Sequence, residues 1–244
     1  MEIVVLTAVG VGGATVIGAV LGFVFKKTAQ RYGGTVLAFA SGVMLAAAIL
    51  GLILPSVEYG GRFGSLIAVC GIFIGAFTIS ALDGLVPQLQ SLFCGKAGQG
   101  EGKVNKGIVL VLAIAIHNLP EGIAAGVGFG SGDTASALFI AGGIALQNLP
   151  EGMVIISPML LAGVPPRRAF FIAALTGAVE VLGTFIGYFA VSIASAVLPF
   201  ALAFAGGTML FVICDDMIFE NNTEGSRRSA VYALLAGFSL MLLF

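Results

Sequence analysis

The chain has 244 residues, of which 59% are hydrophobic and only 9% are charged, and its mean hydropathy is +1.11. Soluble domains carry charge on about a quarter of their residues, so this composition excludes an ordinary soluble globule. The net charge of −1 and the lack of a basic patch exclude a nucleic-acid partner, which would be held through its phosphates. The composition indicates an all-α, polytopic protein of the lipid bilayer, with one integral domain over residues 1–244.

The apolar runs predict a bundle of eight transmembrane helices, taking about 20 apolar residues for one span. The predicted spans are 3–25, 34–57, 64–86, 107–129, 135–161, 169–191, 194–219 and 229–244. The 36 glycines suit helices that approach one another closely in a membrane, and they also permit a homodimer.

The basic residues predict the orientation of the bundle. If eight spans alternate, ten of the eleven lysines and arginines lie on one side, and only Arg62 lies on the other. By the positive-inside rule that side is the cytoplasm, so both termini are predicted to lie outside the cytoplasm. The predicted location is the plasma (inner) membrane of the cell. The polar, glycine-rich stretch 94–106 is predicted to be a flexible cytoplasmic loop. The ten residues are Lys26, Lys27, Arg31, Lys96, Lys103, Lys106, Arg167, Arg168, Arg227 and Arg228.

A repeated polar motif interrupts two of the apolar runs. The copies are AIHNLPEGI at 115–123 and ALQNLPEGMV at 145–154, and a further acid, Glu180, lies in the next span. A charge at the bilayer centre costs at least about 2.5–3.5 kcal/mol, so acids in spans are functional candidates. Counting from the span ends places seven polar side chains near one level. They are His117, Asn118, Glu121, Gln147, Asn148, Glu151 and Glu180.

The spacing within each copy puts its polar groups on one helix face, because residues three and four apart are neighbours. Pro120 and Pro150 are expected to free the carbonyls of Ile116 and Leu146 and to kink both helices. Bent helices with free carbonyls line the binding sites of many transporters.

The seven side chains offer one imidazole, three amide oxygens and three carboxylates, a set that suits a divalent cation of borderline hardness. Carboxylates that face one another across such a site repel, so metal entry should displace protons from them. The simpler alternative is that each polar group makes a helix-to-helix hydrogen bond. That alternative suits an isolated Asn or Gln better than two copies of NLPEG with a third midplane acid.

HNLPEG and QNLPEG resemble the paired motifs of the Zrt/Irt-like (ZIP) family of divalent metal transporters, with the glutamine typical of prokaryotic members. The resemblance implies eight helices with both ends outside and a binuclear site bridged by Glu121 and Glu151. His117 and Gln147 would complete one metal position, and Asn118, Asn148 and Glu180 the second. It also implies Zn²⁺ or a related divalent metal as transported substrate, with one helix bundle moving against the other like an elevator.

The resemblance extends more loosely to a pathway on either side of the site. Met44 would face the site and Glu58 would lie at the outer mouth, whereas the acids Asp83, Asp215 and Asp216 would form the cytoplasmic exit. Met209 is a further pathway candidate in the span of the last two acids. The alternatives are plain packing for the methionines and solvated helix ends for the acids. The loop 94–106 contains no histidine, so it is not expected to buffer metal.

The residues present also bear on two other classes of function. An intramembrane metalloenzyme is disfavoured because the chain has a single histidine and no HExxH motif. An ion-coupled transporter of another solute remains the main alternative, although the spans hold no Lys or Arg to pair with an anionic substrate. The prediction is therefore a transporter, not an enzyme, that takes zinc, or a related divalent ion such as iron, manganese, cobalt or cadmium, into the cytoplasm.

Overall fold

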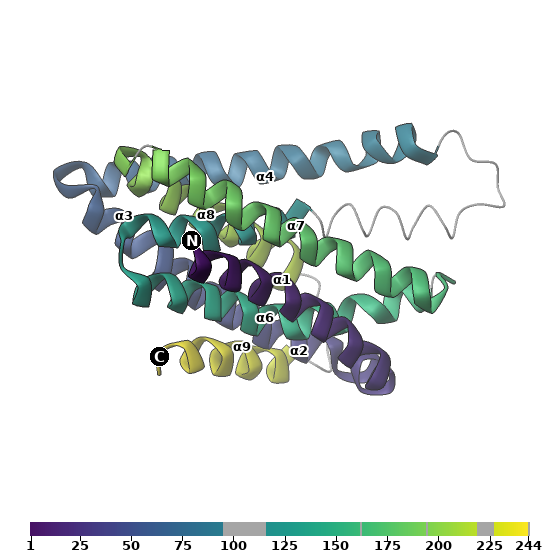
Figure 1. Cartoon of the computed structure of the whole chain (residues 1–244). Coiled ribbons are helices and arrows are strands. Elements are labelled where there is room, and N and C mark those ends of the chain that lie inside the picture. Colours follow the sequence, from purple (N-terminus) through teal and green to yellow (C-terminus); the bar gives the residue numbers. More distant parts are fainter. Residues whose placement is uncertain (95–115, 162, 194, 219–226, 244) are drawn as a thin grey trace.

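The computed structural model describes residues 1–94, 116–161, 163–193, 195–218 and 227–243, and the regular elements within them are all helices (Figure 1). Residues 116–128 form the helix that carries the first motif copy, called the motif helix below. The other elements are α1 (Glu2–Val24), α2 (Lys26–Ala46), η1 (Ala47–Ile53), α3 (Leu54–Tyr59), η2 (Gly61–Phe63), α4 (Gly64–Cys94), η3 (Phe129–Ser131), α6 (Thr134–Leu161), α7 (Pro166–Ile193), η4 (Ser195–Val197), α8 (Leu198–Val212), η5 (Ile213–Ile218) and α9 (Arg227–Met241).

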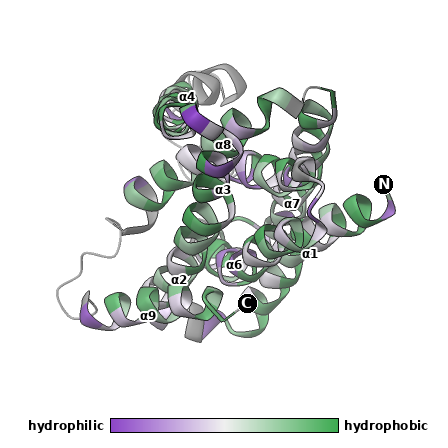
Figure 2. Ribbon diagram, turned by 90° about the vertical axis from the view of Figure 1, so that its left-hand side faces the viewer, coloured by the Kyte–Doolittle hydropathy of each residue, from purple (hydrophilic) through white to green (hydrophobic). Residues whose placement is uncertain are grey.

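Six of the described helical stretches are long and apolar enough to cross a membrane. Large apolar side chains point outward along them, as Phe73 and Phe77 of α4 do with 72% and 74% of their surface exposed, and Figure 2 shows the predominance of hydrophobic residues along the helices. This confirms an all-helical, multi-pass membrane protein. Residues 107–115 of the predicted span 107–129 and nearly all of the loop 94–106 lie outside the described residues, and α9 is a shorter apolar helix, so the count of eight stays a prediction.

The second helix begins earlier than its hydropathy indicates. The predicted span starts at residue 34, whereas α2 starts at Lys26, directly after the break in α1 at Phe25. Hydropathy marks only the part of a helix that can lie in hydrocarbon. Backbone hydrogen bonds continue through the polar turns beyond it, because they need no apolar surroundings.

The two termini lie at the same end of the bundle, and α2, α7 and α9 all begin toward the opposite end (Figure 1). This is the alternation that the basic residues predicted, since α2, α7 and α9 begin with or near Lys and Arg. Which end faces the cytoplasm remains a prediction from the charge asymmetry.

Two helices contain wider, π-type turns. In the first, η1 precedes α3, whose second residue is Pro55. A proline cannot donate to the carbonyl four residues back and its ring would clash with it, so the turn before Pro55 widens instead. The second wide turn, η5, carries Asp215 at the end of α8. By contrast, α6 runs through Pro150 and the motif helix through Pro120 without a change of helix type.

Glycines bring the helices into backbone contact in pairs. A Cβ on Gly18 of α1 would overlap the Leu149 carbonyl oxygen of α6, and one on Gly75 of α4 would overlap the Phe204 carbonyl oxygen of α8. Small residues permit this approach in membranes, where close packing replaces the hydrophobic effect between helices. The structure therefore contains two closely packed helix pairs, α1 with α6 and α4 with α8.

Asp133 caps the N-terminus of α6. Its Oδ1 accepts a hydrogen bond from the Ala135 amide (2.9 Å), and its Oδ2 accepts one from the Ser136 hydroxyl (2.5 Å). The Ser136 hydroxyl is the main cause that lowers the pKa of Asp133, with backbone amides adding to it.

We expect Ser136→Ala to move the pKa of Asp133 up toward its ordinary value, because it removes the main donor to the carboxylate. The ionised cap stabilises the fold above the ordinary carboxyl pKa, and the contribution disappears as the pH falls through the lowered, folded-state value. Carboxyl titration by NMR measures the shift. A pKa unchanged by Ser136→Ala would contradict the assigned cause, and Ser192→Ala, which removes an exposed hydroxyl elsewhere, is the control.

Candidate metal site

The glycine of each motif copy lies against the backbone of another helix. A Cβ on Gly122 of the motif helix would overlap the Glu180 carbonyl oxygen of α7, and a Cβ on Gly152 of α6 would overlap the Thr15 carbonyl oxygen of α1. The two copies thus use the same residue for the same purpose. Each glycine lets its helix come close enough for the neighbouring polar side chains to reach across.

Glu180 is the centre of a buried hydrogen-bond network that joins four helices. Its side chain has no exposed surface, and its Oε1 accepts hydrogen bonds from the Thr15 hydroxyl (2.7 Å) and the Asn118 amide. Its Oε2 accepts from the Asn148 amide (2.6 Å). A buried carboxylate is costly unless it is well hydrogen-bonded, and three donors meet that need here.

The carboxylate of Glu180 decides how both asparagines point. A carboxylate can only accept, so Asn118 and Asn148 must each turn their NH₂ group toward it, which directs their Oδ1 atoms elsewhere. Asn148 uses its NH₂ group a second time, donating to the Val11 carbonyl of α1 (3.2 Å). Both amide oxygens are buried and have no hydrogen-bond partner among the described residues.

A second hydrogen bond joins the two motif copies directly. The Gln147 amide donates to Oε1 of Glu121 at 2.6 Å, and both side chains are buried. The remaining oxygens, Oε2 of Glu121 and Oε1 of Gln147, are buried without a partner within the described part of the chain. Gln147 repeats the pattern of the asparagines, because its amide nitrogen forms a hydrogen bond between two helices while its amide oxygen has no partner among the described residues.

Within the described residues, four buried oxygens are therefore left unpaired, one each from Asn118, Glu121, Gln147 and Asn148. Buried polar atoms in proteins nearly always have partners, so four exceptions within the two motif copies call for a cause. All four are oxygens, two come from each motif copy, and oxygen atoms are the ligands that hard and borderline divalent cations accept. The arrangement suits a cation as the missing partner.

Glu151 completes the group of acids at this site. Its side chain is half-buried, and it lies near enough to Glu121 and Glu180 for its charge to act on both. These three carboxylates come from three helices, the motif helix, α6 and α7. A cation placed among them would relieve their mutual repulsion.

The histidine of the first motif copy faces a different acid from those of the motifs. His117 Nε2 lies 3.3 Å from Oδ1 of Asp83 on α4, with 13% and 28% of the two side chains exposed. The sequence placed Asp83 on a cytoplasmic exit and did not predict this contact. The structure thereby connects the imidazole of the site with the predicted exit.

No three His, Cys, Asp or Glu side chains of the described residues lie close enough together to hold a metal ion by themselves. Such a set leaves out amide side chains, to which three of the four unpaired atoms described above belong. The binuclear arrangement, with its bridging glutamates, is thus still a prediction.

The predicted pathway residues fall into two groups. Met44 and Met209 are buried in the same apolar core cluster, where they pack as core residues do. Glu58 at the end of α3 and Asp215 in η5 are exposed. The side chain of Asp216 lies outside the described residues. The burial of these side chains does not test their predicted roles, which stay predictions.

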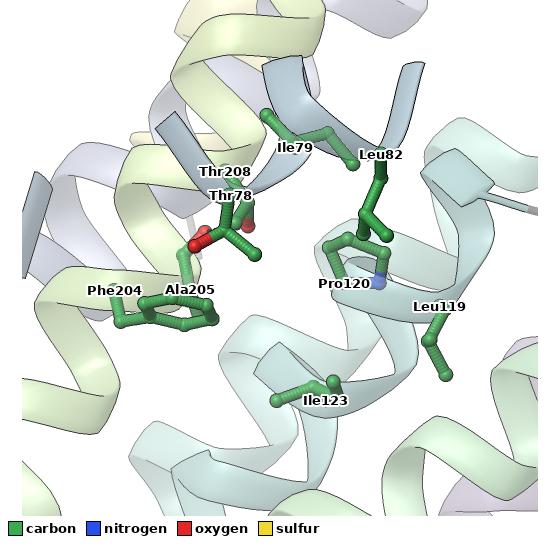
Figure 3. A pocket seen from close by; sticks show the side chains of 9 residues that line it. All are labelled: Thr78, Ile79, Leu82, Leu119, Pro120, Ile123, Phe204, Ala205 and Thr208. Carbon is green, nitrogen blue, oxygen red and sulfur yellow. Dashed lines mark hydrogen bonds between the residues drawn. The ribbon is translucent and has the colours of Figure 1, made fainter. Parts of the chain in front are cut away.

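A cavity of about 180 Å³ lies between the motif helix, α4 and α8 (Figure 3). The hydroxyls of Thr78 and Thr208 donate to carbonyls of their own helices, so they offer the cavity little polarity. At this place the cavity separates the motif helix from the α4 and α8 pair. The lining residues are Thr78, Ile79, Leu82, Leu119, Pro120, Ile123, Phe204, Ala205 and Thr208.

Sequence reasoning missed the contribution of α1 to the site. Thr15 and Val11 are four residues apart, so they share the face of α1 that meets Glu180 and Asn148. Neither residue is ionisable, and a search for charges in spans passes over both. The available signal was a threonine in an apolar run, set between Gly12 and Gly18.

Comparison with known proteins agrees with the paired motif. The model of the family described as ZIP zinc transporter matches residues 95–244. The chain is 35% identical to zinc transporter GufA of Myxococcus xanthus, covering 95% of this chain and 93% of that protein. It is 32% identical to zinc transporter ZIPB of Bordetella bronchiseptica (94% and 76% covered) and 32% identical to human zinc transporter ZIP11 (94% and 92% covered). The chain therefore belongs to the ZIP family of membrane transporters and is a transporter rather than an enzyme.

Proposed function

We propose that this protein carries zinc ions across the plasma membrane into the cytoplasm through the site between the motif helix, α6 and α7. The observation that carries the proposal is the set of four buried, unpaired oxygens from the two NLPEG copies. The relatives named as zinc transporters over nearly the whole chain support zinc as the cargo. Basic residues lie near the starts of α2, α7 and α9, and the positive-inside rule assigns that end of the bundle to the cytoplasm. Transport toward that end would therefore be uptake into the cell.

The site would hold two metal ions bridged by Glu121 and Glu151. The position with Asn118, Asn148 and Glu180 is supported by the hydrogen bonds that already orient both asparagines. For the other position, the unpaired oxygens of Glu121 and Gln147 support the assignment, with His117 as its third member.

The contact between His117 and Asp83 supports a route for release. An imidazole that meets Asp83 in one conformation and the site in another can pass a metal ion from the centre toward Asp83, and then toward Asp215 and Asp216. Met44 and Glu58 would lie on the entry side, and Met209 on the exit side. The cavity beside Pro120 supports relative motion, because it separates that part of the motif helix from α4 and α8.

The ligand set supports breadth among divalent ions. Amide and carboxylate oxygens with one imidazole are harder ligands than thiolates, and softer metals gain no advantage from them. Iron, manganese, cobalt and cadmium ions would then compete with zinc. A homodimer in the bilayer remains a further prediction from the glycine content.

Zinc uptake into proteoliposomes tests the function. Purified protein, with a zinc-sensitive dye inside the vesicles, should give uptake that saturates with zinc and that falls when Mn²⁺, Co²⁺ or Cd²⁺ is added outside. Vesicles without protein are the control for leakage. Uptake equal to that control would contradict the proposal, and uptake that ignores every competing ion would contradict the breadth of the site.

A further inference from the structure

The hydroxyl of Thr15 is used differently from the other buried threonine hydroxyls near the site. Thr176 donates to the Ala173 carbonyl and Thr184 to the Glu180 carbonyl, each within its own helix, α7. This is the ordinary habit of threonine in helices. Thr15 instead donates from α1 to the carboxylate of Glu180 on α7, at 2.7 Å. Thr15 is buried, so no solvent competes for this hydrogen bond.

The place of Thr15 is set by close backbone packing on both sides. A Cβ on Gly12, one turn before, would overlap the Gly177 carbonyl oxygen of α7, and a Cβ on Gly18 would overlap the Leu149 carbonyl oxygen of α6. The two glycines hold α1 against α6 and α7 at once. Thr15 lies between them, so its hydroxyl has a fixed position relative to Glu180.

The hydrogen bonds then form a chain from α1 to the unpaired oxygens. Thr15 holds Oε1 of Glu180, and Glu180 holds the NH₂ groups of Asn118 and Asn148. The NH₂ groups in turn direct the two Oδ1 atoms. If Oε1 lost the Thr15 hydroxyl, the buried carboxylate could rotate, and both asparagines would follow it.

We propose that Thr15 is a positioning residue of the metal site, which holds Glu180 so that Asn118 and Asn148 present their oxygens to the cation. This inference rests on the proposed function, because it assigns the cation to the same network. It concerns the half of the site built on the asparagines. In the other half, Gln147 donates to Glu121 instead of to Glu180.

Isothermal titration of the purified protein with Zn²⁺ tests the inference, since it measures the dissociation constant of each bound ion. Thr15→Val has nearly the same shape as threonine but no donor. One hydrogen bond to a charged group changes binding by about tenfold or more, so the dissociation constant of at least one zinc ion should rise about tenfold. Thr15→Ser restores the donor and should bring the constant back to within about twofold of wild type.

Thr176→Val is the matched control, because it makes the same change at an equally buried threonine of α7 whose hydroxyl serves only its own helix. Its zinc constants should equal those of wild type. If Thr15→Val shows no cooperative thermal unfolding, Thr15→Ala, which is smaller, carries the same expectation.

Two results would overturn the inference while leaving the proposed function intact. One is a Thr15→Val protein with wild-type zinc constants, and the other is a Thr15→Ser protein as weak as Thr15→Val, which would make the role one of packing. A wild-type protein that binds no zinc would overturn the proposed function and this inference together.

Discussion

Glu121→Gln should reduce zinc uptake by about a hundredfold while leaving the fold intact. Glutamine has the shape of glutamate, and its oxygen can still accept the hydrogen bond from Gln147, so the contact between the two motif copies survives. What disappears is the charge, at a residue whose second oxygen is buried and unpaired. Changing even the groups around a metal ligand costs about 10–100-fold, so loss of a charged ligand belongs at the upper end.

Initial rates of zinc uptake into proteoliposomes, with equal amounts of protein, measure this effect. Glu2→Gln is the matched control, because it removes an exposed carboxylate at the start of α1. Its uptake should equal that of wild type. Glu121→Gln uptake within twofold of wild type would remove Glu121 from the site and leave the unpaired oxygens without the proposed explanation.

Gly122→Ala should lower both the stability and the uptake activity of the protein. The added methyl group would overlap the Glu180 carbonyl of α7, and that atom is backbone, so it cannot turn away. The motif helix and α7 would have to separate, at a cost of about 1–3 kcal/mol for an overfilled contact. Separation also moves Asn118 away from Glu180, so activity should fall beyond what the loss of folded protein explains.

Thermal unfolding in detergent and uptake per folded molecule measure the two effects. Gly142→Ala is the matched control within α6, because a Cβ there meets no atom within 4 Å. It should leave both quantities unchanged, or raise stability slightly through the better helix propensity of alanine. A Gly122→Ala protein that unfolds and transports like Gly142→Ala would show that the close contact with α7 is dispensable.

His117 and Asp83 illustrate the limit of reasoning from spacing. Helical periodicity could place His117 beside Glu121, because both lie on the motif helix. It could not bring Asp83 to His117, since the two belong to helices separated by a long stretch of sequence. Contacts of that kind depend on how helices rotate and slide against one another, and glycine contacts at many places decide those movements together.

The amino-acid sequence by itself indicated that the protein is helical and crosses the membrane, because only 9% of its residues are charged and its apolar runs have the length of membrane-spanning helices, which satisfy their own backbone in lipid. It also indicated which side chains are candidates for a metal site, since polar groups in spans are costly. Only the tertiary structure decided which atoms of these side chains form hydrogen bonds between helices and which oxygens have no hydrogen-bond partner among the described residues. A hydrogen bond requires two groups at one distance and angle, and Thr15 meets Glu180 only after α1 has packed on α6 and α7.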